Sequence, residues 1–313
     1  METAIILLLS LILVFIIIFV ISYISYRIAF LAPKRSEEQL YALPQGEQYI
    51  VHHTAIRKCM DEMRGASYEE VYITAHDGTK LFGRYYHVKD NAPVQIQFHG
   101  YKSSAYKDFC GGSKLARQME HNALVVDQRS HGKSEGSTIS FGINERKDVL
   151  SWVTYIMERC GEKTTIILCG LSMGAATVLM AADLDLPKNV VGIIADCPYS
   201  SPKAIIQKVS RDMHLPSKIM YPFVKLGALL FGHFHLEETS AVSAVAKAHL
   251  PILLFHGDDD RFVPCEMSRE IKEACASSVT LEVIPGAGHG LCYMVEPKRY
   301  EEATVKFIQA IVP

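Results

Sequence analysis

The chain has 313 residues, of which 49% are hydrophobic and 21% are charged, and its formal net charge is -2 at pH 7. This length is sufficient for one large α/β domain. The near-neutral charge, without any Lys- or Arg-rich tract, argues against nucleic acid as a partner.

The first element in chain order is an uncharged, strongly apolar segment from Thr3 to Tyr26. As a helix rising about 1.5 Å per residue, this segment is long enough to cross a hydrocarbon core of about 30 Å. A buried core helix is rarely apolar on every face over such a length. A cleaved signal peptide would have a basic n-region and a clear small-x-small cleavage site, and this segment has neither. We therefore expect residues 1–32 to form an uncleaved transmembrane anchor.

Flanking charges predict the orientation of this anchor. Arg27, Lys34 and Arg35 flank its C-terminal end, whereas Glu2 and the α-amino group flank the other end. The positive-inside rule then places the large domain in the cytoplasm of a single-pass membrane protein. The eight cysteines form no CxxC pair, which disfavours a disulfide framework and agrees with a reducing compartment.

Residues 33–66 are polar and contain Pro44 and Gly46, so we expect a juxtamembrane linker followed by a short helix from Ile50 to Met63. The large domain is expected over residues 67–313. It begins with an antiparallel hairpin, because strand-like residues 71–75 and 81–86 flank a His-Asp-Gly turn signal.

Beyond the hairpin, short apolar runs alternate with amphipathic segments, as expected for parallel strands joined by crossover helices. We expect strands at Val94–Phe98, Ala123–Asp127, Thr165–Cys169, Val190–Ala195, Ile252–Phe255 and Thr280–Ile284, and helices at Asp108–Glu120, Asn144–Arg159, Met173–Ala182, Cys265–Ala276 and Pro297–Ile311. Residues 199–249 contain several prolines and no clear strand, so we expect a helical lid over the carboxyl ends of the strands. The predicted fold class is α/β, with a mostly parallel central sheet flanked by helices, a lid insertion and an N-terminal transmembrane helix.

The strongest chemical motif lies at an expected strand-to-helix turn. The pentapeptide GLSMG, residues 170–174, follows an apolar run and precedes a helix-forming stretch. Such a turn exposes the central hydroxyl, and its glycines let the backbone pass closely. Gly-x-Ser-x-Gly also occurs by chance in loops, but the strand before it and the helix after it favour Ser172 as a nucleophile.

A serine nucleophile needs a base to accept its proton and a carboxylate to orient that base. Residues 256–264 (HGDDDRFVP) directly follow one expected strand, and residues 286–290 (GAGHG) directly follow the next. They supply an acid and then His289, in the chain order Ser, acid, His that this arrangement uses. Asp196, at the end of an earlier expected strand, is a more distant candidate for the acid.

These motifs resemble the α/β-hydrolase superfamily, in particular its esterase and serine aminopeptidase-like branch with a short lid. The resemblance covers the chain from the hairpin to the C-terminus. It implies that the acid is the fifth residue of a pattern His-Gly-x-x-Asp-x-x-Val-Pro, which is Asp260 here. Asp258 and Asp259 are the neighbouring alternatives. The expected catalytic residues are thus Ser172, Asp260 and His289.

Acyl transfer also requires backbone N–H groups that stabilise the developing oxyanion. Met173 is expected to supply one, as the residue after the nucleophile. The family resemblance implies Tyr101, in the loop after the third strand, as the second donor. Tyr101 stands where related loops carry glycine, so its ring is also expected either to cover the pocket or simply to pack.

Two further segments have simpler interpretations. Residues 127–136 (DQRSHGKSEG) resemble a structural loop of the same family, so a scaffold role is favoured for His131 over a second base. Residues 219–231 of the lid are apolar and are expected to pack on the sheet, to line an acyl pocket or to rest on the bilayer. Histidine spacing supports no metal site, and we expect no cofactor.

We therefore expect a membrane-anchored serine hydrolase that acts on a small-molecule or lipid-like acyl substrate and cleaves a carboxylic ester or related acyl bond. One alternative is an aminopeptidase-like serine peptidase, which would need a carboxylate to hold the substrate amine. A less favoured alternative is a scaffold that has retained the fold without catalysis. The acyl chain, the leaving group and the oligomeric state are left open.

Overall fold

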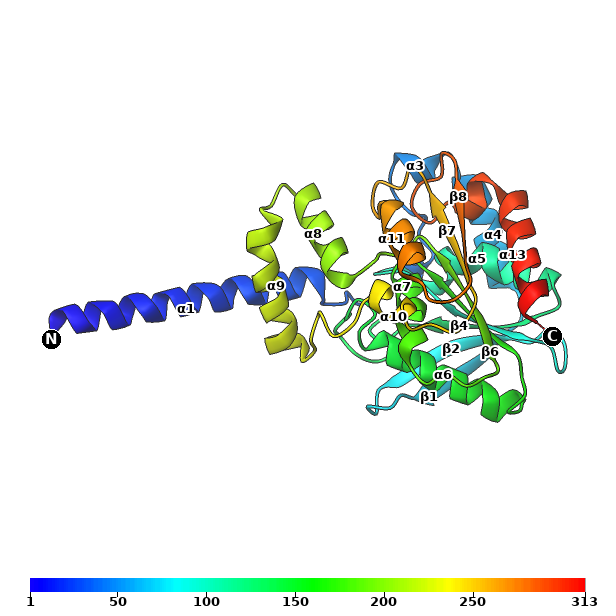
Figure 1. Ribbon diagram of the computed structural model, residues 1–313, viewed down its shortest axis with the longest axis horizontal. Coiled ribbons are helices and arrows are strands. Elements are labelled where there is room, and N and C mark those ends of the chain that lie inside the picture. Colours follow the sequence, from blue (N-terminus) through cyan, green and yellow to red (C-terminus); the bar gives the residue numbers. More distant parts are fainter. Residues whose placement is uncertain (313) are drawn as a thin grey trace.

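The computed structural model describes residues 1–312 and is centred on an eight-stranded sheet (Figure 1). The strand order is β1-β2-β4-β3-β5-β6-β7-β8. The strands are β1 (Glu69–Thr74), β2 (Lys80–Tyr86), β3 (Val94–Phe98), β4 (Asn122–Asp127), β5 (Ile166–Leu171), β6 (Val190–Asp196), β7 (Ile252–Gly257) and β8 (Val279–Ile284). The hairpin β1-β2 pairs with β4 in antiparallel fashion, and all pairs from β4 to β8 are parallel.

Helices cover both faces of this sheet, and each face has its own hydrophobic core. Trp152 of α6 and Val178 of α7 belong to one core, whereas Phe109 of α5 and Ile308 of α13 belong to the other. The helices are α1 (Glu2–Ala29), α2 (Glu37–Leu40), α3 (Glu47–Ile50), α4 (His53–Gly65), α5 (Ala105–Gln118), α6 (Glu145–Cys160), α7 (Met173–Met180), α8 (Pro202–Asp212), α9 (Ser217–Gly232), α10 (Ala241–Val245), α11 (Glu266–Ala274), α12 (Cys292–Val295) and α13 (Pro297–Ile311), and a short 3-10 turn (Ala181–Asp183) follows α7. The predicted fold class is confirmed, with each expected strand and helix of the large domain present within a few residues.

The segment expected to be a linker followed by a short helix contains the helix α4 and packs on the large domain. Its helix α4 places Ile56, Met60 and Met63 in the same core as α5. These residues recur at helical spacing and form one apolar face, which has to be covered by protein. Residues 33–66 therefore connect α1 to the sheet as packed structure and not as a free linker.

The lid consists of α8, α9 and α10 and contains no strand, as predicted for residues 199–249. Figure 1 shows α1 projecting from the domain, with α8 and α9 standing beside its C-terminal part. Small residues allow α1 and α9 to approach closely, because a Cβ added at Gly227 would lie 2.5 Å from the carbonyl oxygen of Ser22. The ring of Phe231 also packs against Phe19 and Tyr23 of α1.

The end of α1 is built into the large domain. Phe30 is fully buried and makes edge contacts with Phe141 and Phe234. Backbone hydrogen bonds join Ile139 N to Phe30 O at 2.7 Å and Ala32 N to Ser137 O at 2.8 Å. The first half of α1, in contrast, exposes its apolar side chains.

Candidate active site

Ser172 lies at the turn between β5 and α7, in a conformation that few non-glycine residues adopt. Its φ is 54° and its ψ is -114°. Glycine is required on both sides, because a Cβ at Gly174 would lie 1.8 Å from the oxygen of Phe98 and one at Gly170 would lie 2.3 Å from the oxygen of Gly174. This crowding explains the Gly-x-Ser-x-Gly spacing, and it holds a strained Ser172 at the carboxyl end of the sheet.

Three residues singled out by the sequence form one hydrogen-bonded line. The Oγ of Ser172 lies 2.9 Å from Nε2 of His289, and Nδ1 of His289 lies 2.7 Å from Oδ2 of Asp260. The carboxylate can only accept, so Nδ1–H donates to it and Nε2 is left to accept from the serine hydroxyl. This geometry positions His289 to take a proton from Ser172.

Asp260 is distinguished from its two neighbours by its contacts. Its other oxygen accepts hydrogen bonds from the amides of Phe262 and Val263 at 2.9 and 2.8 Å. Burial alone would raise the pKa of Asp260, but hydrogen bonds from His256 and His289 lower that pKa well below the ordinary range. The carboxylate therefore stays ionised at neutral pH.

The other carboxylates considered for this role are engaged elsewhere. Asp258 accepts from the amide of Gly286, and the half-buried Asp259 pairs with Arg261. Asp196 is buried at the end of β6, and burial raises its pKa to about 6 even though hydrogen bonding and nearby histidines act in the opposite direction. Within residues 1–312, neither these groups nor Asp196 hydrogen bonds to His289.

Two supporting residues were not predicted from the sequence. His256 is fully buried at the end of β7, with Nδ1 2.6 Å from Ser268 Oγ and Nε2 2.8 Å from the oxygen of Val263. The position of His256, four residues before Asp260, is the sequence signal that could have indicated its supporting role. Tyr49, from the segment expected to be a linker, donates its hydroxyl to the oxygen of His289 at 2.9 Å, and no sequence signal pointed to it.

The loop after β3 passes close to Ser172, since a Cβ added at Gly100 would lie 3.3 Å from the Cβ of Ser172. The next residue of this loop is Tyr101. On one side of it, the amide of Gly100 donates to Asp108 Oδ2 at 2.6 Å, and on the other the amide of Lys102 donates to Nε2 of His131 at 3.0 Å. Among the described residues, the amides of Tyr101 and Met173 have no protein acceptor. Both predicted donors are thus free to bind an oxyanion.

His131 contacts this loop and not Ser172. Its Nδ1–H donates to the oxygen of Arg129 at 2.9 Å, while Nε2 accepts from Lys102. Burial lowers the pKa of His131 to about 3, so the ring is neutral at physiological pH. Both ring nitrogens are occupied by the backbone, which favours the scaffold interpretation of this histidine.

One set of possible metal ligands was found in residues 1–312, namely Cys197, Asp260 and His289, with ligand atoms within 4.8 Å of one another. The carboxylate and imidazole of this set already hydrogen bond to each other. Hydrogen bonding therefore accounts for their proximity without a metal.

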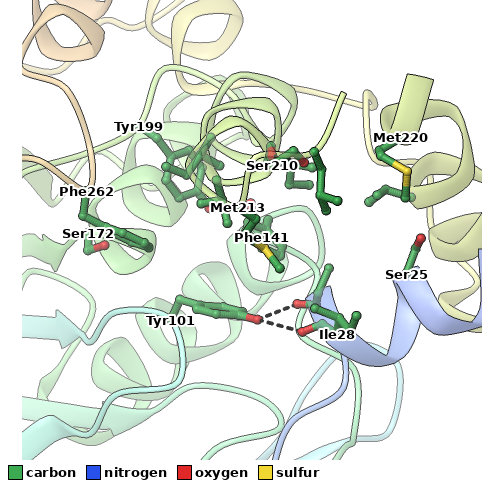
Figure 2. A pocket seen from close by; sticks show the side chains of 16 residues that line it. Ser25, Ile28, Tyr101, Phe141, Ser172, Tyr199, Ser210, Met213, Met220 and Phe262 are labelled. Atoms are coloured by element: carbon green, nitrogen blue, oxygen red, sulfur yellow. Dashed lines mark hydrogen bonds between the residues drawn. The ribbon is translucent and has the colours of Figure 1, made fainter. Parts of the chain in front are cut away.

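Two cavities meet at Ser172. The first, shown in Figure 2, has a volume of about 250 Å³ and is almost entirely apolar. Its walls come from the lid, for example Ile206 and Val224, and from Ser25, Ile28 and Ala29 of α1. The lid segment therefore lines the pocket, which was one of the three roles expected for residues 219–231. The contribution of α1 to the pocket was not expected.

The second cavity is polar and has a volume of about 290 Å³. It is lined by His289 and Tyr49 and by three cationic side chains, Arg35, Lys102 and Lys107. Ser172 borders both cavities, whereas His289 borders only the polar one of these two.

Comparison with known proteins identifies the family. The model of the Alpha/beta hydrolase family matches residues 98–303. The chain is 26% identical over 188 residues to the uncharacterized protein YqkD of Bacillus subtilis, a match that spans 60% of this chain and 62% of that protein. It is 30% identical over 135 residues, 42% of each chain, to the thiohydrolase aneE of Aspergillus aculeatus.

Solved structures agree with this assignment. The Pyrococcus furiosus esterase Pf2001 superposes with a TM-score of 0.65 at 25% identity, covering 80% of this chain and 95% of the esterase. The resemblance inferred from residues 170–174 and 256–290 is confirmed, and this chain belongs to the alpha/beta hydrolase family.

Proposed function

We propose that the protein is a membrane-anchored serine esterase that cleaves a carboxylic ester, or a related acyl bond, through an acyl-enzyme on Ser172. The observation that carries this proposal is the line of hydrogen bonds from Ser172 through His289 to Asp260. The free amides of Tyr101 and Met173 beside the serine support the same chemistry, because acyl transfer develops negative charge on the carbonyl oxygen.

In the proposed reaction, Ser172 Oγ attacks the acyl carbon while Nε2 of His289 accepts the hydroxyl proton. Asp260 keeps the ring in the required tautomer and stabilises the imidazolium. The amides of Tyr101 and Met173 bind the oxyanion. His289 then protonates the leaving oxygen as the acyl–oxygen bond breaks, and water releases the acyl group from Ser172 by the reverse sequence of proton transfers.

The two cavities would hold different parts of the substrate. A leaving group has to lie next to the general acid, so it occupies the polar cavity that His289 lines. The acyl chain then occupies the apolar cavity between the lid and α1. Burial of apolar chain there contributes roughly 0.8 kcal/mol per methylene, so long acyl chains are favoured over acetate.

An aminopeptidase is less well supported by the same site. The polar cavity contains the carboxylate of Asp108, but its two oxygens accept from the amide of Gly100 and from the hydroxyl of Ser103. A free substrate amine would also meet three cationic side chains in that cavity. These features favour an ester over a peptide with a free N-terminus.

We also propose that α1 is a transmembrane anchor. It is long and apolar enough to cross a membrane, and its side chains up to Ile18 are almost all exposed. The lid exposes Ile219, Leu229 and Leu230 beside it. We place these lid residues at the bilayer surface, and the basic residues after α1 favour the cytoplasmic side.

The test uses the full chain in detergent micelles and a p-nitrophenyl ester series from acetate to palmitate. Wild type should hydrolyse the esters with an optimum at longer chains, and Ser172→Ala should lose activity by about 10⁴-fold or more. Labelling by a fluorophosphonate should depend on Ser172. A wild-type chain that neither hydrolyses any ester nor takes the label would contradict the proposal and favour a scaffold.

A further inference from the structure

The polar cavity contains three cationic side chains that form no ion pair with a carboxylate within residues 1–312. Arg35 follows α1, Lys102 lies in the loop after β3, and Lys107 lies on α5. The ammonium groups of Lys102 and Lys107 donate to the backbone oxygens of Ile28 and Gln39, at 3.1 and 3.3 Å. Within the described part of the chain, none of the three cations forms an ion pair with a carboxylate.

These charges repel one another. Burial lowers the pKa of Lys102 and of Lys107, and the nearby guanidinium of Arg35 lowers both further. Asp108 is the carboxylate that lines the same cavity, and its oxygens are held by Gly100 and Ser103. Three cations against one carboxylate leave the cavity with an excess of positive charge, which an anion would relieve.

The position of His289 assigns this cavity to one part of the substrate. The general acid protonates the oxygen of the departing alcohol, so the alcohol part lies on the side of His289. His289 lines the cationic cavity and not the apolar one, while Ser172 borders both. The cations therefore line the cavity that receives the alcohol part.

We propose, on the basis of the proposed esterase function, that the substrate is a fatty-acyl ester whose alcohol carries an anionic group such as a phosphate. Arg35, Lys102 and Lys107 bind that anion, while the acyl chain lies between the lid and α1. In the reaction, the bond from Ser172 Oγ to the acyl carbon forms and the bond to the alcohol oxygen breaks. His289 passes the serine proton to this oxygen, and the alcohol leaves with its anionic group.

The anion belongs either to a lipid head group or to a water-soluble ester. Arg35 follows shortly after the end of α1, so the cationic cavity lies at the level at which the proposed anchor leaves the bilayer. Head-group phosphates occupy this level of a membrane. The same cations would bind a phosphate ester that arrives from water, so the experiment includes both kinds of substrate.

The test compares monopalmitoylglycerol phosphate with neutral monopalmitoylglycerol, both in mixed micelles of one uncharged detergent. The measured quantity is the ratio of their kcat/KM values, for the full chain and for Arg35→Gln, Arg35→Lys and the double variant Arg35→Gln/Lys107→Gln. Lys298→Gln, which removes a cation from α13, is the matched control. A soluble pair, monohexanoylglycerol phosphate and monohexanoylglycerol, is measured without micelles.

The phosphate ester should be preferred by wild type, and the preference should fall by about tenfold in Arg35→Gln, since hydrogen bonds between charged groups are stronger than those between neutral groups. The double variant should lose more, Arg35→Lys should keep most of the preference, and Lys298→Gln should match wild type. The soluble pair should show the same preference. The kcat/KM values of the palmitoyl and hexanoyl phosphate esters then indicate whether the lipid or the water-soluble ester is used more efficiently.

Three outcomes would overturn the anion site: equal use of charged and neutral esters, a preference unaffected by Arg35→Gln, or a preference that appears in micelles but not with the soluble pair. Each of these leaves Ser172-dependent ester hydrolysis intact. Loss of all ester hydrolysis in wild type would instead contradict the proposed function itself, so the two failures are distinguishable.

Discussion

The hydroxyl of Tyr101 donates a hydrogen bond of 2.7 Å to the carbonyl oxygen of Ala29, in the last turn of α1 (Figure 2). The amide of the same tyrosine is a proposed oxyanion donor and has no protein acceptor among the described residues. One residue thus links the end of α1 to the proposed oxyanion site.

Tyr101→Phe removes this link and keeps the amide. We expect the free energy of unfolding to fall by about 1 kcal/mol, the usual contribution of one hydrogen bond, and kcat/KM for long-chain esters to fall several-fold. Thermal unfolding and ester kinetics in detergent measure the two effects. Tyr72→Phe is the control, since that hydroxyl is exposed and lies 3.5 Å from Glu70. Equal behaviour of both variants would show that the link has no role in the site.

Substitution of Gly227 tests whether α1 and α9 together form one wall of the apolar cavity. Gly227→Ala introduces a methyl group 2.5 Å from the oxygen of Ser22, so α9 has to move away from α1. We expect a loss of about 1–3 kcal/mol in stability and a broader preference for acyl-chain length. Gly65→Ala is the matched control, because its Cβ would meet no atom within 4 Å. An unchanged chain-length profile in Gly227→Ala would argue against the shared wall.

Asp260→Asn should reduce kcat by about 10⁴-fold, because an amide stabilises the wrong tautomer of the partner histidine. Asp259→Asn should change kcat less than about threefold, because the side chain of Asp259 pairs with Arg261 and not with His289. Asp196→Asn tests the remaining candidate acid. A greater loss in Asp196→Asn than in Asp260→Asn, with both variants folded by circular dichroism, would reassign the acid.

His131→Phe removes the acceptor of the Lys102 amide and leaves that buried group unpaired. We expect kcat/KM for esters to fall by about tenfold or more, because the loop that carries the Tyr101 amide is displaced. An unchanged kcat/KM in the folded variant would contradict this role of His131.

The same histidine predicts a dependence of stability on pH. Burial lowers the pKa of His131 to about 3 in the folded state, and in the unfolded chain the pKa is about 6.5. The unfolded state therefore binds a proton first as the pH falls, and stability decreases between these values by at most about 1.4 kcal/mol per pH unit. The melting temperature of wild type should fall more steeply from pH 7 to pH 4 than that of His131→Phe.

Leu230→Trp tests the proposed position of the lid at the bilayer surface. The single native tryptophan, Trp152, is buried in the core, so the new residue dominates any lipid-dependent signal. Brominated lipids should quench the fluorescence of Leu230→Trp in vesicles. Tyr72→Trp, at an exposed strand, should not be quenched, and equal quenching of the two would place the lid away from the membrane.

The parallel sheet and the main motif residues were predictable from local patterns. Strands such as β3 and β4 are buried on both faces and therefore appear as continuous apolar runs. Ser172 is marked by flanking glycines that crowding requires, and Asp260 and His289 lie directly after strands. These signals are local in the chain.

The features that could not be predicted from the sequence depend on contacts between segments that are distant in the chain. The apolar residues of α1 surround the whole helix, so no pattern shows that Ser25 and Ile28 face a cavity while Leu8 and Leu13 do not. The contact of Gly227 with Ser22 involves two small residues that are individually unremarkable. Tyr49 hydrogen bonds to His289, a residue far away in the sequence, and only the folded chain brings the two together.

The last turns of α1 pack within the enzyme, with Phe30 at zero exposure and backbone hydrogen bonds to residues 137–139. A domain on a flexible tether can turn and reach to any distance that its tether allows, but this chain has no such freedom between α1 and its serine. If α1 is embedded as we propose, the height of Ser172 above the bilayer is a constant of the fold. The proposed anchoring would then suit the enzyme to molecules of the leaflet in which it stands, and not to those of a facing membrane.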